Sequence, residues 1–219
     1  MRKFTSDTHY GHANIISFCD RPFRRSAFEI DQRDVNVMNT SMLRAALDSL
    51  DEGDELVHVG DVALGKIAVT LRYLSLIPSP VTLVAGNHDR CHPCNKGFMK
   101  WRDIYRDEAR LEPILENQLL LKLSDGTWVK VCHFPYAQRD DGMEDRHGVL
   151  VPDKFAQWRP EDDGKTWLLH GHVHNAWRQK GRMINVGVDA WGGRPVFEEE
   201  ITALITAGPR DLPSLPWEI

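Results

Sequence analysis

The stretch VTLVAGNHD at residues 81–89 joins an apolar strand to a tight polar turn. The uncharged run at 81–85 predicts a strand buried inside a sheet, and Gly86 marks its end. Asn87 and His88 follow directly, so an amide oxygen and an imidazole stand where the strand ends. Because ligand sites in open α/β sheets collect at the carboxyl ends of strands, this segment predicts a polar site at a sheet edge.

Two earlier segments share this plan of a short strand followed by polar residues. Residues 2–6 predict a strand that delivers Asp7 and His9. Residues 55–59 predict a second strand, which leads into Asp61. The three strand ends together offer carboxylate, imidazole and amide groups from separate parts of the chain.

The elements between and beyond these strands indicate the fold class. Amphipathic helices are expected over residues 31–49 and 66–77, where apolar side chains recur at helical spacing. This β-α-β-α-β order predicts neighbouring strands in one largely buried sheet. The second half is richer in strands, which are expected at 114–123, 127–133, 167–169, 183–186 and 195–204, the first two joined by a Ser-Asp-Gly-Thr hairpin turn. The whole pattern predicts a two-sheet α/β sandwich.

Length and composition limit the domain organisation. The 219 residues are 42% hydrophobic, which suits one substantial core. We expect a single domain over residues 1–206 and a proline-rich, extended tail over 207–219. An Asp-rich insert at 139–164 is expected to form a surface loop or cover. No apolar run approaches the roughly 20 residues of a membrane span, and the first residues lack the apolar stretch of a signal peptide, so the expected location is the cytoplasm.

The charge balance disfavours one class of partner. The formal net charge is −5 and the pI is about 6.0, whereas proteins that coat nucleic acid usually carry a basic excess. Long nucleic acid is therefore a disfavoured partner, and a small substrate is favoured. Two bound dications would cancel the ligand carboxylates and leave a region that attracts phosphate. The oligomeric state stays open.

The first two motifs have the chemistry of metal ligands. Asp7 and His9 are two residues apart, and side chains at i and i+2 of an extended chain point the same way, so both can reach one metal. Asp61 carries two oxygens and can bridge two cations. Taken alone, however, the Asp7 and His9 pair is better explained by a capping or turn aspartate and a surface histidine, and an aspartate in a turn at a strand end is a common alternative for Asp61.

The turn at the end of the opening stretch is more specific. Asn87 offers a neutral amide oxygen to a metal, and His88 would face the substrate, with Asp89 holding that imidazole in its protonated form. Arg90 is a candidate to bind a phosphate group of the substrate, and a solvent-exposed charge in a loop explains it equally well. His12 is a further candidate for substrate contact.

Three more histidines complete the set. His172 and His174 follow a glycine and can point toward neighbouring metals, whereas His170 is better explained as a structural imidazole. His133 ends another strand. A lone histidine at such a position is more often a packed core residue, so only the presence of the other motifs makes His133 a candidate metal ligand. Carboxylate, amide oxygen and imidazole from five places suit two adjacent divalent metals.

One cysteine pair stands apart from these motifs. Cys91 and Cys94 have a CxxC spacing, but a closed zinc site needs two more ligands. Reduced thiols in a loop are the favoured interpretation.

In this order the motifs resemble those of the calcineurin-like metallophosphoesterase superfamily, which carries Asp-x-His, Gly-Asp, Gly-Asn-His-Asp/Glu, His and Gly-His-x-His. The resemblance spans residues 7–174, and the strand region to about 204 fits the same fold. The run SDTHYGHANII at 6–16, with Arg-Pro-Phe at 21–23, is similar to small phosphoesterases from phages and bacteria. The resemblance implies a four-layer α/β/β/α sandwich with a dinuclear metal site at the strand carboxyl ends.

Carried over residue by residue, the resemblance also implies the roles of the site residues. The residues that would hold one metal are Asp7, His9 and His174. The residues that would hold the other are Asn87, His133 and His172. Asp61 would bridge the two ions, and His88 would be a catalytic acid. The implied cofactors are two divalent ions, with Mn²⁺ favoured and Fe or Zn²⁺ as alternatives.

These roles predict a reaction. A hydroxide held between two dications is a nucleophile at neutral pH, and His88 would donate a proton to the leaving oxygen. We therefore expect a phosphoester hydrolase. The family resemblance, rather than any single residue, implies that it hydrolyses small phosphodiesters, with cyclic nucleotides as candidate substrates. A phosphomonoesterase or nuclease with the same centre is the alternative, and a non-catalytic scaffold is less favoured because every ligand is present.

Overall fold

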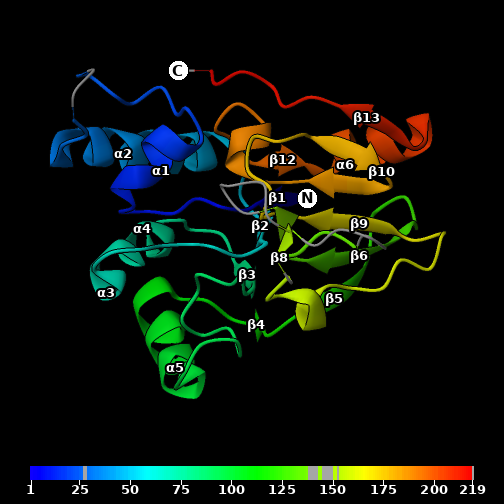
Figure 1. The fold of residues 1–219 in the computed structure, drawn as a ribbon, viewed down its shortest axis with the longest axis horizontal. Coiled ribbons are helices and arrows are strands. Elements are labelled where there is room, and N and C mark those ends of the chain that lie inside the picture. Colours follow the sequence, from blue (N-terminus) through cyan, green and yellow to red (C-terminus); the bar gives the residue numbers. More distant parts are fainter. Residues whose placement is uncertain (27–28, 138–142, 145–149, 152, 219) are drawn as a thin grey trace.

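The computed structural model of the chain describes residues 1–26, 29–137, 143–144, 150–151 and 153–218. These residues form two large β-sheets packed face to face, with helices on the outer side of the first sheet. Figure 1 shows the helices of the first half, coloured blue to green, to the left and the second sheet to the right. The arrangement confirms the expected α/β fold with two sheets.

The first sheet carries the strands of the expected β-α-β-α-β order. Its strand order is β12-β1-β2-β3-β4, with β1 to β4 parallel and β12 antiparallel to β1. The strands are β1 (Arg2–Thr5), β2 (Glu55–His58), β3 (Val81–Val84), β4 (Ile114–Leu115) and β12 (Val196–Phe197). The helices over its outer face are α1 (Ala13–Phe18), α2 (Gln32–Ser49), α3 (Ile67–Thr70), α4 (Arg72–Ser75) and α5 (Phe98–Ala109).

The second sheet has the order β13-β10-β11-β9-β6-β5, and β6, β9 and β11 are its parallel strands. Its strands are β5 (Gln118–Lys122), β6 (Trp128–Cys132), β9 (Trp167–His170), β10 (Gln179–Gly181), β11 (Met183–Asn185) and β13 (Arg210–Leu212). The expected hairpin is present as β5 and β6, whereas residues 114–115 belong to the first sheet. The remaining elements are β7 (Met143–Glu144), β8 (Leu150–Val151), η1 (Ala156–Trp158), η2 (Val188–Ala190) and α6 (Glu198–Ala207).

Burial explains why these layers stay together. The longest helix, α2, begins at a capping box in which Asp31 accepts the backbone N–H of Asp34 and Asp34 accepts that of Asp31. Its buried face carries Val35, Met38, Met42 and Ala46. Alternate residues of both sheets fill the space between them, among them Phe4, Val57, Val84, Val129, Leu169 and Ile184. On the outer face of the second sheet, Phe134 and Leu168 pack with Phe155 and Trp158 near η1.

Three sequence-based expectations about elements differ from the structure. The single helix at 66–77 is two short helices, because Leu74 and Ile77 donate to the carbonyl three residues back and tighten the chain there. The strand at 195–204 was wrong beyond Phe197. A helix begins there because Glu200 accepts the Phe197 N–H at 3.0 Å and three glutamates occupy its first turn. Helix α5 was not predicted.

The tail and the insert also have defined places. The tail residues of β13 pair with β10, and the Trp217 ring lies 5.3 Å from the Phe23 ring. Much of the insert at 139–164 lies outside the described residues. Among the described residues, no helix combines the length and apolar character that crossing a membrane requires.

Candidate metal centre

The seven expected ligands all follow strands whose carboxyl ends meet at one edge of the two sheets. Asp7 and His9 follow β1, Asp61 follows β2 and Asn87 follows β3 in the first sheet. From the second sheet, His133 follows β6, while His172 and His174 follow β9. The edge therefore brings together residues up to 167 positions apart, from 7 to 174.

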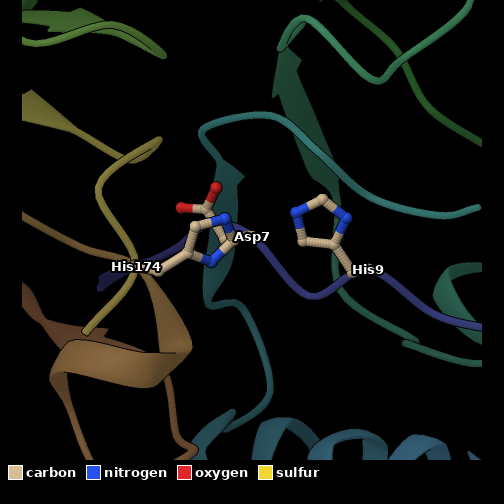
Figure 2. A group of neighbouring side chains, drawn as sticks. All are labelled: Asp7, His9 and His174. Carbon is tan, nitrogen blue, oxygen red and sulfur yellow. The ribbon is translucent and has the colours of Figure 1, made fainter. Parts of the chain in front are cut away.

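The side chains at this edge form two overlapping groups. Potential ligand atoms of Asp7, His9 and His174 lie within 4.8 Å of one another, and so do those of Asp7, Asp61 and His133. Figure 2 shows the Asp7 carboxylate beside the His174 ring, with the His9 ring across from them. These separations suit ligand atoms that surround a shared cation.

Asn87 and His172 extend the second group. The Asn87 Oδ1 atom lies 3.2 Å from His133 Nε2 and 3.0 Å from His172 Nδ1. The Asp61 Oδ2 atom lies 3.4 Å from His133 Nε2. An amide oxygen, a carboxylate and two imidazoles therefore converge from four strand ends.

The backbone of the site is unusual. Five of the seven expected ligands have left-handed backbone angles, with φ of 55° at Asp7, 48° at His9, 57° at Asp61, 73° at His172 and 49° at His174. Such angles are uncommon outside glycine and cluster at functional sites. The extended-chain reason for pairing Asp7 with His9 was therefore wrong, although their ligand atoms do lie together.

The glycines of the motifs allow the loops to approach one another. A Cβ at Gly86 would lie 2.7 Å from the Asp61 backbone N and 2.8 Å from His133 Nδ1, closer than real Cβ contacts come. A Cβ at Gly171 would overlap Ser6 Oγ and Asp7 Oδ2. Glycine is thus required before Asn87 and before His172, because any side chain at Gly86 or Gly171 would clash with the neighbouring ligand loops.

The donor set fits a divalent metal. His9 is buried, and neither of its ring nitrogens has a hydrogen-bond partner among the described residues. Burial also lowers the pKa of His9 well below its usual value, so this imidazole is neutral and has a lone pair to donate. His133 Nδ1 lies 2.8 Å from the Val59 carbonyl, which leaves Nε2 directed at Asp61.

Opposite charges dominate the titration of this group. Burial alone would lower the pKa of His133, but the attraction of Asp61 outweighs it and raises that pKa to about 9. Burial favours neutral Asp61, but the charge of His133 and the hydrogen bond with that ring hold the pKa of Asp61 well below its usual value. Asp61 is therefore a carboxylate, the form in which it binds a cation.

Comparison with known proteins agrees with this geometry. The sequence model of the calcineurin-like phosphoesterase superfamily domain matches residues 4–195. The chain belongs to the calcineurin-like phosphoesterase superfamily. This phosphoesterase is therefore a metal-dependent hydrolase of phosphoesters.

The chain is similar to proteins from phages and from one archaeon, and to one solved structure. The chain is 32% identical over 213 residues to the Gene 66 protein of Mycobacterium phage L5, and the match covers 92% of each. It is 32% identical over 219 residues to the uncharacterized protein MJ1445 of Methanocaldococcus jannaschii, with 95% of this chain and 94% of that protein covered. The protein of unknown function AQ665 from Aquifex aeolicus shares the fold, with a TM-score of 0.60, 24% identity and coverage of 93% and 98%.

A buried ion pair that sequence reasoning missed supports one side of the phosphoesterase site. Arg21 is fully buried and binds both oxygens of Asp189, at 2.8 and 2.9 Å. It also donates to the backbone carbonyls of Asp7, at 2.7 Å, and Thr8, at 3.0 Å. Arg21 thus ties the first ligand loop to η2.

Asp189 in turn orients His174. Its Oδ2 atom lies 3.0 Å from His174 Nδ1. Burial raises the pKa of Asp189, but Arg21 and His174 outweigh it and lower that pKa to about 2. A carboxylate only accepts, so His174 Nδ1 must donate, and Nε2 stays available for a metal. The Arg-Pro-Phe run was a signal for Arg21, whereas nothing local pointed to Asp189.

Asp89 has a different role from the one expected. Its carboxylate accepts the backbone N–H groups of Asp61, Val62 and Gly86 at 2.8–2.9 Å and lies 3.3 Å from the Tyr105 hydroxyl. These four donors, none of them the His88 imidazole, use both of its oxygens. Asp89 therefore joins the loops after β2 and β3, and the expectation that it holds the His88 ring is corrected.

The candidate substrate residues surround the ligands. His88 is exposed, and its ring centre lies 5.3 Å from that of His9. Half-buried His12 lies 5.6 Å from His9 and has an unpartnered Nδ1 among the described residues. Arg90 is exposed, and its guanidinium lies 4.4 Å from the centre of the Trp101 ring. His170 is buried against Trp177.

The CxxC segment lies beside the site. Cys91 is buried, Cys94 is exposed, and the Cys94 backbone N–H donates to Nδ1 of the buried His92 at 3.1 Å. Among the described residues, neither cysteine belongs to a cluster of potential metal ligands. The segment is a turn that packs a histidine, in agreement with thiols in a loop.

Proposed function

We propose that this phosphoesterase hydrolyses small phosphodiesters with two divalent ions, Mn²⁺ first among them, and that cyclic nucleotides are candidate substrates. One observation carries the proposal. The Asp61 Oδ2 atom lies 3.6 Å from His9 Nε2 and 3.4 Å from His133 Nε2. One oxygen thus stands between imidazoles from the two expected ligand groups, which supports Asp61 as the bridge of a two-ion site.

The chain's own groups would divide the remaining work. When bound, the two ions would supply Lewis acidity toward phosphate and activate a water as the nucleophile. The backbone N–H of His88 donates to Asp61 Oδ1 at 2.8 Å, so the bridging carboxylate is held with its other oxygen toward both histidines. The exposed His88 imidazole is free to donate a proton to the leaving oxygen of the substrate.

Metal removal followed by a substrate panel tests this function. Thorough chelation should abolish hydrolysis of bis(p-nitrophenyl) phosphate, and Mn²⁺ should restore it. The panel then compares that diester with p-nitrophenyl phosphate, 2′,3′- and 3′,5′-cyclic nucleotides and a short RNA. Activity that survives chelation, or a clear preference for the monoester or the RNA, would reject the proposal in favour of a different mechanism or substrate.

The proton donor has its own test. His88→Ala should keep its bound metal, since its side chain belongs to neither ligand group. It should lose turnover by about 10²-fold or more on esters with poor leaving groups and less on p-nitrophenyl esters, because only poor leaving groups need the proton. Equal losses on both would argue against an acid role.

A further inference from the structure

A hollow of about 310 Å³ lies next to the candidate metal centre. It is lined by residues 65–69, at the start of α3, by Arg90, and by Trp101 in the first turn of α5. Its volume is at the lower end of the range for small-molecule sites. None of the metal ligands lines it, so it is a separate compartment.

Two connections show that the hollow is near the candidate metal centre. Arg90 follows His88 by two residues, so their Cα atoms are at most about 7 Å apart. The Leu64 N–H donates to the Tyr10 carbonyl at 2.9 Å, so the loop that carries the hollow runs beside the ligand loop after β1. The hollow therefore lies near both His88 and the ligand loop after β1.

The lining has the chemistry of an anion site with an apolar wall. Neither Lys66 nor Arg90 forms an ion pair with any residue that the structure describes. Arg90 lies over the Trp101 ring, and a guanidinium stacked in this way keeps its N–H donors free in its plane. Val69, which is 58% exposed, supplies apolar surface.

We propose that this hollow binds a second phosphate of the substrate, one sugar unit away from the phosphate that is hydrolysed. The inference rests on the proposed phosphodiesterase function and deepens it, because it names nucleotides with an additional phosphate as the substrate class. Lys66 contributes a point charge, and Arg90 contributes a two-donor contact suited to phosphate oxygens. The sugar would lie against the apolar wall.

A pair of nucleotide esters that differ only in the second phosphate tests the inference. The substrates are thymidine 5′-(p-nitrophenyl phosphate) and the same compound with a 3′-phosphate. With the Mn²⁺-loaded enzyme, kcat/KM should be about tenfold higher for the second, mainly through a lower KM. Lys66→Gln and Arg90→Gln should each bring this ratio close to one. Lys165→Gln, which removes an exposed charge outside the hollow, should keep the wild-type ratio.

A binding measurement keeps the inference separate from the proposed function. Calorimetry should show adenosine 3′,5′-bisphosphate binding about tenfold more tightly than adenosine 5′-monophosphate, with the difference lost in Lys66→Gln. If neither ester is hydrolysed but this difference appears, the phosphodiesterase proposal fails and the second-phosphate site stands. Equal kcat/KM for the two esters, or a ratio unchanged in both Gln variants, overturns the site.

Discussion

Replacing Asp189 with Asn probes the link between the buried ion pair and the metal centre. The substitution keeps the shape of the side chain but turns one acceptor oxygen into a donor NH₂ group. In the native protein, Oδ1 binds Arg21 Nε, and Oδ2 binds both Arg21 Nη2 and His174 Nδ1. The new NH₂ must therefore face a donor: Arg21 Nε if it replaces Oδ1, or both Arg21 Nη2 and His174 Nδ1 if it replaces Oδ2.

The expected losses of stability and of metal affinity can both be given a magnitude. Breaking a buried ion pair while one charge remains costs about 3–5 kcal/mol. We expect about 3 kcal/mol, because Arg21 still donates to the carbonyls of Asp7 and Thr8. For a chain of this length that loss lowers Tm by about 9 °C. If the NH₂ faces His174, the proton moves to Nε2, the nitrogen left for a metal, and metal affinity should fall about 10–100-fold.

The assay measures Tm and bound Mn²⁺ on the same samples. Asp162→Asn is the matched control, because Asp162 also binds an arginine, Arg182, with both oxygens, at 2.7 and 2.8 Å, but at the surface. A partly exposed pair contributes at most about 1 kcal/mol, so the control should lose less than about 3 °C and bind metal normally. If Asp189→Asn matched this control in both readings, the orienting role of Asp189 would be refuted.

Three other predictions concern separate parts of the molecule. Gly171→Ala should destabilise the protein and weaken metal binding, because the new Cβ would overlap Ser6 and Asp7. Thermal melts with and without Mn²⁺ measure both effects. In the control Gly164→Ala the residue has a positive φ but open space around it, so it measures the cost of backbone strain without a steric clash. Burial raises the pKa of Glu200, but the hydrogen bonds from Arg194 and from the Phe197 N–H outweigh burial and lower that pKa. The ionised Glu200 therefore stabilises the fold above the pKa that it has in the unfolded chain, and this stabilisation is lost as the pH falls through its lower pKa in the folded protein. Glu200→Gln should therefore lower the free energy of unfolding by about 0.5–1 kcal/mol at pH 7. At a low pH, where the Glu200 carboxyl is protonated and as neutral as the Gln side chain, the two proteins should be equally stable, and denaturant curves at the two pH values would show this. A thiol reagent should modify exposed Cys94 in the native protein before the three buried cysteines, and Cys94→Ser should remove that first phase.

The site could largely be predicted from sequence because its residues follow recognisable strands. Asp61 and Asn87 each stand after a short apolar run and a glycine, and the parallel order of those runs brings their ends together. The helix α5 was missed although Phe98, Trp101 and Tyr105 recur at helical spacing, since no side-chain cap marks its start at Gly97. The helix α6 was mistaken for a strand because its apolar residues alone do not distinguish the two.

The supporting residues were harder to find for a different reason. Arg21 and Asp189 are 168 positions apart, so neither residue's surroundings in the sequence show that a buried charge will find its partner. Asp89 did stand in a motif, but its neighbour His88 suggested the wrong contact. Its true partners are backbone N–H groups, which every residue has and which no sequence pattern reveals.

These two buried groups also explain how the strained loops persist. Five ligands in left-handed conformations cost at least about 1 kcal/mol each, a total comparable to the net stability of a typical domain. Asp89 accepts the backbone N–H of Asp61, and Arg21 donates to the backbone carbonyl of Asp7, so the strained loops after β2 and β1 are each held by a buried charge. The third strained loop, after β9, is held where the Asp7 carboxylate accepts the His172 backbone N–H. Hydrogen bonds to charged groups are worth about 1.5–3 kcal/mol each, enough to offset that strain. The ligand geometry is therefore built by residues that would touch no metal, and changing them should disturb the centre as much as changing a ligand.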